Sequence, residues 1–135
     1  MPGELALDSL AADLNDRHLF FLTRTPENGP LTVHPHEGPV ERHEFGFRQP
    51  SSLSVEVDPA TIDVVLTPGL CFDRRGGRLG WGKGYYDELL ARMPHARAVV
   101  GVTLARFVVD FVPLEPHDRR MTHLVTERGV RLALS

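Results

Sequence analysis

Three glycines alternate with larger residues in the segment Arg78-Leu79-Gly80-Trp81-Gly82-Lys83-Gly84, which runs directly into Tyr85-Tyr86-Asp87. Glycines at every second position let the backbone turn so that neighbouring N–H groups can point at one anion. A helix beginning at Tyr85 would turn its positive end to the same place. Arg78 and Lys83 add mobile positive charge. We therefore predict that this glycine loop, residues 78–84, binds a triphosphate or another polyanion.

The glycine spacing does not by itself decide between a binding loop and an ordinary turn, because a glycine-rich turn before a helix is common. Two standard phosphate motifs do not fit. A Walker A loop requires Ser or Thr after its lysine, whereas Gly84 follows Lys83. A dinucleotide fingerprint follows directly on a strand, whereas the preceding apolar run stops near Thr67.

The elements that must position this loop are those of an α/β fold. Residues 62–67 form an apolar run stopped by Pro68-Gly69, which predicts a strand covered on both faces. Residues 84–93 predict a helix, and residues 98–103 predict a second buried strand. The helix would carry one apolar side, made of Tyr86, Leu89, Leu90 and Met93. Ligands of such folds bind at the carboxyl ends of parallel strands, which is where we expect the loop.

The rest of the chain predicts shorter elements. Leu5, Leu7, Leu10 and Leu14 are spaced as one helical face. Residues 19–23, 31–33 and 123–126 predict strands, the last turning at Gly129 toward residues 130–132. Residues 34–59 predict loop and edge structure, and residues 105–111 a short amphipathic piece. A chain of 135 residues without an interdomain linker fits one domain.

Bulk properties narrow the classes of partner. The net charge of −3 gives no broad attraction to nucleic acid, so an anion site must be built locally. The single cysteine, Cys71, excludes an internal disulfide, and its apolar surroundings predict a buried small hydrophobe. Neither a membrane-spanning run nor a secretory signal is present, so we expect a cytoplasmic protein with no membrane partner.

Two longer strings, residues 63–73 and 78–87, resemble the signature of the 5-formyltetrahydrofolate cyclo-ligases, also called methenyltetrahydrofolate synthetases. The resemblance continues through Val102, residues 113–118 and residues 124–127, so it covers roughly the C-terminal two-thirds of the chain. It implies a single α/β domain over residues 1–135, with a three-layer α/β/α fold and a mostly parallel sheet.

The resemblance also implies a reaction, in which ATP phosphorylates the formyl oxygen of a reduced folate, N10 closes on the activated carbon, and phosphate leaves. It assigns catalysis to Arg78, Lys83 and Tyr85, and positions Mg²⁺ with Asp87 and Asp118. The nucleotide contacts it implies are Arg78, Leu79, Gly80, Trp81, Gly82, Lys83, Gly84, Tyr85 and Tyr86.

Simpler interpretations exist for several of these residues. An acid such as Asp87 is favoured in the first turn of a helix without any metal. Asp118 could be a turn residue, the two tyrosines could be packing residues, and Trp81 could cover the loop rather than stack on a ring. His34, His36 and His43 suggest a metal site, but we expect solvated histidines in a proline-rich loop.

The sequence departs from the family pattern in two ways. The family's basic N-terminal helix and part of its folate pocket are not found, and residues 1–16 contain acids but no Lys or Arg, so we expect a shortened member. Gln49 stands where the family often has glutamate. Two functions stay open, an active ligase and a nucleotide- or folate-binding protein without turnover. A homodimer, or Arg42 and Arg48, could replace the missing cations.

Overall fold

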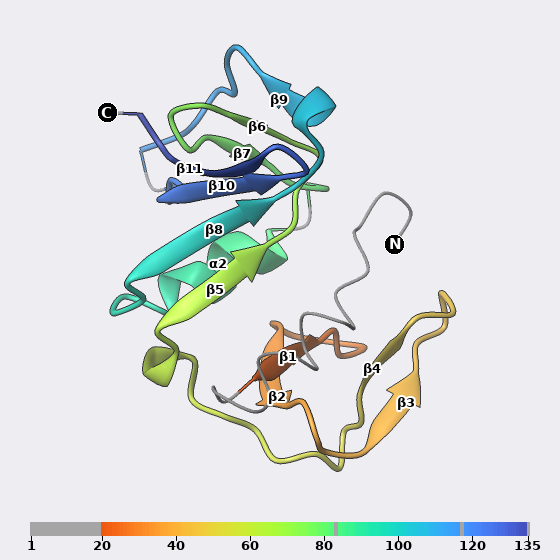
Figure 1. The fold of residues 1–135 in the computed structure, drawn as a ribbon. Coiled ribbons are helices and arrows are strands. Elements are labelled where there is room, and N and C mark those ends of the chain that lie inside the picture. The colour runs from red at the N-terminus through yellow and green to blue at the C-terminus, as the bar shows by residue number, and fades with distance from the viewer. Residues whose placement is uncertain (1–19, 83, 117, 135) are drawn as a thin grey trace. The chain divides into compact units, whose positions relative to one another are not determined.

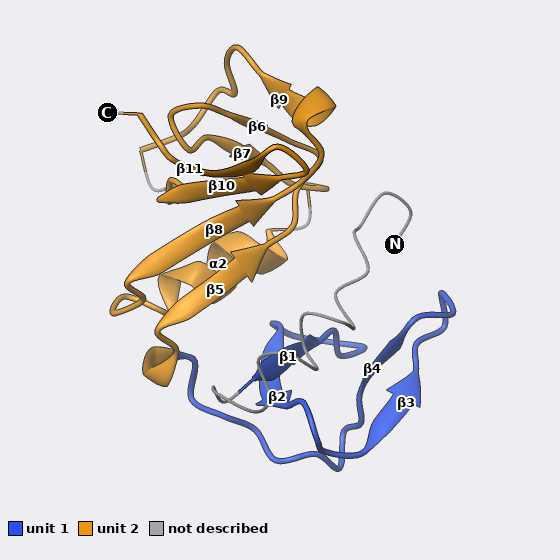
Figure 2. Ribbon diagram, viewed as in Figure 1, with its two compact units in different colours: residues 1–59 blue, residues 60–135 orange. Residues whose placement is uncertain are grey.

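A computed structural model describes residues 20–82, 84–116 and 118–134. The chain divides into two compact units, Met1–Pro59 and Ala60–Ser135 (Figure 2). The helix expected over residues 5–14 lies outside the described residues. This division does not decide whether residues 1–135 form the single domain expected from the sequence, which stays a prediction.

The second unit is built on a four-stranded sheet in the order β11-β10-β8-β5 (Figure 1). Its strands are β5 (Val64–Thr67), β8 (Ala98–Val102), β10 (His123–Thr126) and β11 (Gly129–Leu132). β8 pairs in parallel with both β5 and β10, and β11 returns antiparallel to β10. The fold is therefore mixed α/β with a partly parallel sheet.

Helix α2 (Tyr85–Ala91) lies on one face of this sheet, between β5 and β8 in the chain (Figure 1). Leu89, Leu90 and Met93 are buried, as the apolar side of the helix predicted, whereas Tyr86 is half-buried. The strand-helix-strand unit is thus confirmed. Among the described residues α2 is the one α-helix, so the second helical layer of the α/β/α prediction stays a prediction.

A smaller sheet in the order β7-β6-β9 carries the glycine loop (Figure 1). β6 (Cys71–Asp73) pairs antiparallel with β7 (Arg78–Leu79) and parallel with β9 (Val108–Val109). The fully buried Phe72 lies against Gly101 of β8, where an added methyl group would come 2.5 Å from the ring. Since real contacts are never so short, the buried strand needs glycine at this point.

Three details of the second unit differ from the sequence predictions. β5 is fully covered on one face only, since Val65 and Thr67 are buried, whereas Val64 on the other face is 55% exposed. Cys71 is only partly buried. The amphipathic piece over residues 105–111 is a 3₁₀ turn, η2 (Ala105–Phe107), followed by strand β9.

The first unit consists of two antiparallel hairpins. β1 (Phe21–Arg24) pairs with β2 (Thr32–Pro35), which confirms the two strands predicted here. β3 (Val40–Arg42) pairs with β4 (Arg48–Pro50) inside the region predicted as loop and edge structure. A bridge from Val33 to Val57 ties the following segment to β2. The 3₁₀ turn η1 (Pro59–Thr61) then leads into the second unit.

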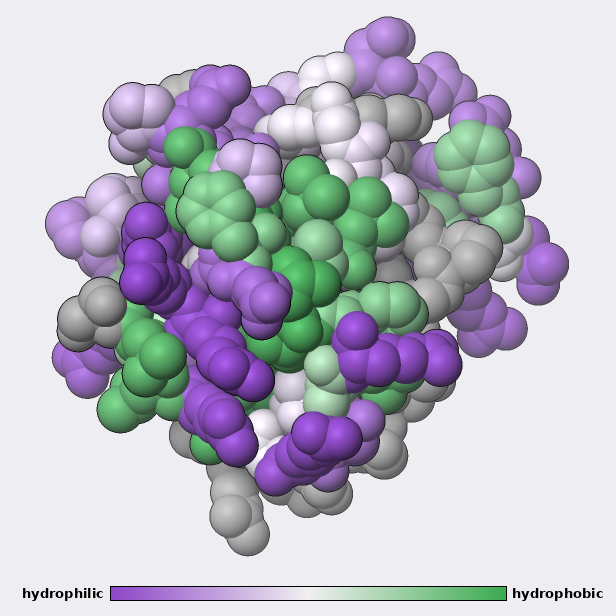
Figure 3. Space-filling view, turned by 90° about the horizontal axis from the view of Figure 1, so that it is seen from above, coloured by the Kyte–Doolittle hydropathy of each residue, from purple (hydrophilic) through white to green (hydrophobic). Residues whose placement is uncertain are grey.

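Several large apolar side chains are exposed in the second unit, among them Phe111 at 71%, Val130 at 67% and Leu132 at 72%. Figure 3 shows apolar and hydrophilic residues interspersed on the face it presents. In the described part of the chain, no helix has the length and apolar character needed to cross a bilayer.

Candidate functional site

The hairpin that leads into the glycine loop is organised by one buried carboxylate, Asp73. Its Oδ1 accepts hydrogen bonds from the backbone N–H groups of Arg75 (2.9 Å) and Gly77 (2.8 Å). Its Oδ2 accepts one from the N–H of Val112 at 2.8 Å. The residue is only 3% exposed. Asp73 therefore fixes the turn between β6 and β7 and ties it to a segment far along the chain.

These hydrogen bonds also set the ionisation of Asp73. Burial acts to raise its pKa, but the N–H groups of Val112, Gly77 and Arg75 and the charge of Arg120 outweigh burial, so the pKa lies below its ordinary value. A carboxylate that accepts several backbone N–H groups is stabilised in its charged form. Asp73 is thus a buried anion whose compensation is supplied by the backbone.

Arg78 follows this turn, and its guanidinium is held rather than mobile. Nε donates to the carbonyl oxygen of Pro68 at 2.6 Å, and Nη1 lies 3.4 Å from Oδ1 of Asp87. The side chain is 6% exposed and its guanidinium lies over the ring of Tyr86, 5.4 Å from the centroid. The expectation of a mobile cation at this position was wrong, because burial and the Pro68 carbonyl fix the side chain.

Asp87 and Asp118 both act electrostatically on this cation. Burial lowers the pKa of Arg78, and Asp87, Tyr86 and Asp118 work in the opposite direction. Arginine stays charged under all ordinary conditions, and both carboxylates, thirty-one positions apart in sequence, favour its charged form. Asp87 pairs with Arg78 directly, and the use of either acid for magnesium stays a prediction.

Backbone conformation requires glycine at two positions of the glycine loop, and close packing favours it at the third. Gly82 and Gly84 adopt φ values of 89° and 71°, a region that other residues rarely occupy. Gly84 is the N-cap of α2 and makes no side-chain capping bond. At Gly80 an added Cβ would lie 3.1 Å from Nη2 of Arg78, so glycine there lets the backbone pass close to the guanidinium.

The other residues proposed for nucleotide contact lie in the glycine loop itself or in the first turn of α2. Leu79 and Trp81 are exposed at 46% and 39%, and Tyr85 and Tyr86 open helix α2 half-buried. Lys83 lies outside the described residues. Among the described residues no group of three potential metal ligands occurs. Magnesium commonly takes only one or two carboxylates beside water and phosphate oxygens, so the assignment of Asp87 and Asp118 stays a prediction.

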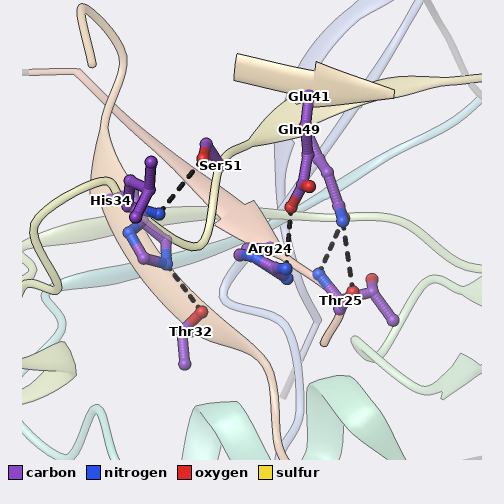
Figure 4. Close-up of polar contacts among 8 residues, drawn as sticks. Arg24, Thr25, Thr32, His34, Glu41, Gln49 and Ser51 are labelled. Carbon is purple, nitrogen blue, oxygen red and sulfur yellow. Dashed lines mark hydrogen bonds and ion pairs between the residues drawn. The ribbon is translucent and has the colours of Figure 1, made fainter. Parts of the chain in front are cut away.

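The three histidines His34, His36 and His43, all among the described residues, do not form a common metal-binding group. His34 is 1% exposed, and its ring hydrogen-bonds Oγ1 of Thr32 at 2.7 Å (Figure 4). The ring also hydrogen-bonds the carbonyl of Val55 at 3.0 Å. The expectation of a solvated histidine was therefore wrong for this residue, which is a hydrogen-bonded part of the interior. His43 stacks on Phe47 in the β3–β4 hairpin, and His36 contacts the ring of Phe20 edge-on.

Gln49 joins the two hairpins of the first unit. Its Oε1 accepts from the N–H of Thr25 at 2.9 Å, and its Nε2 donates to the carbonyl of the same residue at 3.2 Å (Figure 4). Next to it, Nη2 of Arg24 pairs with Oε1 of Glu41 at 2.7 Å. A carboxylate could replace only the acceptor half of the Gln49 contact, because it has no proton to donate.

Comparison with known proteins agrees with the sequence resemblance and extends it. The model of the 5-formyltetrahydrofolate cyclo-ligase family matches residues 14–127. The chain belongs to the 5-formyltetrahydrofolate cyclo-ligase family. The match reaches well beyond the C-terminal two-thirds of the chain, so the range expected from the motifs alone was too short.

Individual cyclo-ligases support the same assignment. The chain is 35% identical to a 5-formyltetrahydrofolate cyclo-ligase of Mycolicibacterium smegmatis, over 96% of this chain and 70% of that protein. It is 39% identical to the yeast cyclo-ligase over 63% of this chain and 42% of that protein. The structure of Aquifex aeolicus 5,10-methenyltetrahydrofolate synthetase superposes with a TM-score of 0.82 at 31% identity, over all of this chain and 69% of that one. The stretch matched in the yeast protein covers less than half of that protein's length.

The first prediction concerns Asp73. We expect Asp73→Asn to lower the free energy of unfolding by about 2–4 kcal/mol at neutral pH, because an amide cannot accept three N–H groups as a carboxylate does. The contribution of Asp73 is fully present above its unfolded pKa of about 3.9 and is lost as pH falls through the lower folded value.

Urea unfolding from pH 7 down to pH 3 tests this expectation. The difference between wild type and Asp73→Asn should shrink below about pH 4. Asp63→Asn, which changes an exposed aspartate of the same unit, should alter stability by no more than about 0.5 kcal/mol. Equal effects of the two substitutions would refute the role given to Asp73.

The second prediction concerns Gln49. We expect Gln49→Glu to destabilise the protein by about 1–3 kcal/mol at pH 7, because the Thr25 carbonyl loses its donor and faces a buried carboxylate. Burial raises the pKa of such an acid, so the loss should diminish as pH falls and the protonated acid can donate again.

Thermal or urea unfolding at pH 7 and pH 5 measures this trend, which arises from a raised pKa in the variant and not, as at Asp73, from a lowered pKa in the wild type. Glu44→Gln changes charge at an exposed position of the same hairpin and serves as the control. A Gln49→Glu protein as stable as wild type at both pH values would contradict the paired contact.

Proposed function

We propose that this family member cyclises 5-formyltetrahydrofolate to 5,10-methenyltetrahydrofolate with ATP, releasing ADP and phosphate. Family membership supports the folate chemistry. The observation that carries the proposal for this chain is the pairing of Arg78 with Asp87 at the base of the glycine loop, on an arginine that also feels the charge of Asp118. A phosphoryl-transfer site needs cations, metal-binding carboxylates and backbone donors in one place.

In the proposed reaction the γ-phosphoryl group of ATP passes to the formyl oxygen, and the bond between that phosphorus and ADP breaks. N10 of the folate then attacks the activated formyl carbon, and the carbon–oxygen bond breaks as phosphate leaves. The protein's task is to hold the reacting atoms in line and to balance negative charge. The formyl carbon becomes the methenyl bridge between N5 and N10.

The residues of this chain are suited to different parts of that task. Arg78 supplies a positive charge that is fixed before ligand arrives, since Pro68 and Asp87 already orient its guanidinium. Gly82 and Gly84 let the backbone follow a phosphate closely. Asp87 and Asp118 would hold Mg²⁺, which when bound would shield the phosphate charges. Lys83 and Tyr85, the other catalytic residues of the proposal, follow from the family resemblance.

Further cations would strengthen phosphate binding. Arg42 and Arg48 are cross-strand neighbours in the β3–β4 hairpin, and both are exposed. We propose them as candidates, from the same chain or from a second subunit of a homodimer. The alternative function, nucleotide or folate binding without turnover, requires the same loop but no completed set of cations.

The third prediction is the reaction itself. We expect 5-formyltetrahydrofolate to be converted to methenyltetrahydrofolate, followed by the absorbance of the product, only when both ATP and Mg²⁺ are present. Calorimetry with ATP and Mg²⁺ on the same preparation separates the two functions. Binding without product would establish the non-catalytic alternative, and the absence of both binding and product would overturn the proposal.

The fourth prediction separates the metal site from the fold. We expect Asp87→Asn and Asp118→Asn to weaken Mg²⁺-dependent ATP binding by about 1–3 kcal/mol each, because each removes one charged ligand. Asp110→Asn is the control, since Asp110 is an exposed aspartate of the same unit that is not among the charges acting on Arg78. Calorimetry at several Mg²⁺ concentrations gives the affinities. If Asp110→Asn weakens binding as much as the other two, the assignment of the metal carboxylates is wrong.

A further inference from the structure

Asp118 lies in a loop without regular secondary structure, so its position must be fixed by specific contacts. The N–H of Asp118 donates to the carbonyl of Glu115 at 3.0 Å, and the N–H of Glu115 donates to Oδ2 of Asp118 at 2.9 Å. These two bonds close a local turn. They shape the turn but do not place it relative to the glycine loop.

Arg119, the next residue, attaches this turn to helix α2. Its Nη1 donates to the carbonyl oxygens of Leu90 at 3.0 Å and Met93 at 2.7 Å. Each of these carbonyls also accepts a backbone N–H, from Met93 at 3.0 Å and from Ala96 at 3.2 Å, so Arg119 adds a second bond at a helix end where the dipole favours a cation. The Arg119 guanidinium therefore holds the loop of Asp118 at the C-terminal end of α2.

The same helix carries Asp87 in its first turn. Helix α2 thus positions both carboxylates. Asp87 lies on the helix, and the loop of Asp118 is bonded to the end of the helix through Arg119. A rigid helix transmits position well, because its backbone hydrogen bonds fix each turn to the next. The separation of Asp87 and Asp118 then depends on the contact made by Arg119.

The residues after Arg119 attach the loop on its other side. Nη1 of Arg120 donates to the carbonyl of Arg75 at 3.2 Å, and the N–H of Met121 donates to the carbonyl of Gly76 at 2.8 Å. Both acceptors belong to the turn that leads to Arg78. The loop of Asp118 is therefore hydrogen-bonded on one side to α2, which carries Asp87, and on the other side to the β6–β7 hairpin, which carries Arg78.

We propose that Arg119 is a positioning residue of the magnesium–nucleotide site, acting through Asp118. Its side chain bonds two carbonyls at the end of α2 and so fixes the loop of Asp118 against the helix that carries Asp87. This inference rests on the proposed function, because it assigns the geometry a role in metal-dependent nucleotide binding. A ligand carboxylate must be held closely, since metal–oxygen bonds tolerate little displacement.

The test compares Arg119→Ala with Arg119→Lys, each in the native and the Asp118→Asn background. The Mg²⁺ concentration needed for ATP binding is measured by calorimetry. Arg119→Ala should raise it by about tenfold in the native background and cause no further change when Asp118 is already asparagine. Arg119→Lys should restore part of the loss, because an ammonium group can also donate to two carbonyls.

Arg92→Ala is the matched control for the stability of the helix end. Arg92 follows the last helical residue, and its side chain pairs with Glu88 at 3.5 Å. This variant should change the melting temperature but leave the Mg²⁺ requirement as it is. A merely structural Arg119 would behave in the same way, and equal effects of Arg119→Ala in both backgrounds would overturn the proposal.

Amide hydrogen exchange in the absence of nucleotide tests the anchoring independently of ATP. The Asp118 N–H should exchange faster in Arg119→Ala than in wild type, and at the wild-type rate in Arg92→Ala. Unchanged exchange in Arg119→Ala would refute the anchor. A wild-type protein that does not bind Mg²⁺ and ATP would refute the proposed function instead, while the exchange rates would still decide whether Arg119 anchors the loop.

Discussion

The candidate site depends on the ionised, buried carboxylate of Asp73. A buried charge is costly unless hydrogen bonds compensate it, and here backbone N–H groups from two separate segments do so. Their convergence closes the β6–β7 turn and brings the segment at Val112 against it. Arg78 begins the strand that leaves this turn, so the position of its guanidinium depends on Asp73, five residues earlier.

The charged side chains of the loop and of its two acids are mixed in sign. Arg78 and Lys83 contribute +1 each and Asp87 and Asp118 −1 each, so these four formal charges sum to zero. In the proposed site a divalent cation bound by the carboxylates would add the positive charge that a nucleotide triphosphate needs, so nucleotide binding would be linked to metal binding through charge.

The sequence predicted the elements whose signal is local. β5, α2 and β8 are marked by apolar runs and by the helical spacing of Leu89, Leu90 and Met93, and the glycine spacing marked the loop. The sequence did not predict that the Arg78 side chain is fixed by the Pro68 carbonyl, that His34 is buried, or that Asp73 organises the hairpin. Each of those facts depends on a partner distant in sequence; Asp73 and Val112 are 39 positions apart. The string Asp73-Arg74-Arg75-Gly76-Gly77 does resemble a turn stabilised by its first side chain, which is the signal that could have identified Asp73.

The close approach of Phe72 to Gly101 has a consequence for how this fold can change over evolutionary time. The ring occupies the volume that any side chain at position 101 would need. A larger residue in β8 therefore requires that the residue in β6 first become smaller. Because Phe72 directly precedes Asp73, such an exchange would also shift the depth at which the hairpin rests on the sheet. Mutational paths at these two positions are thus restricted in their order, which slows divergence at this point of the core.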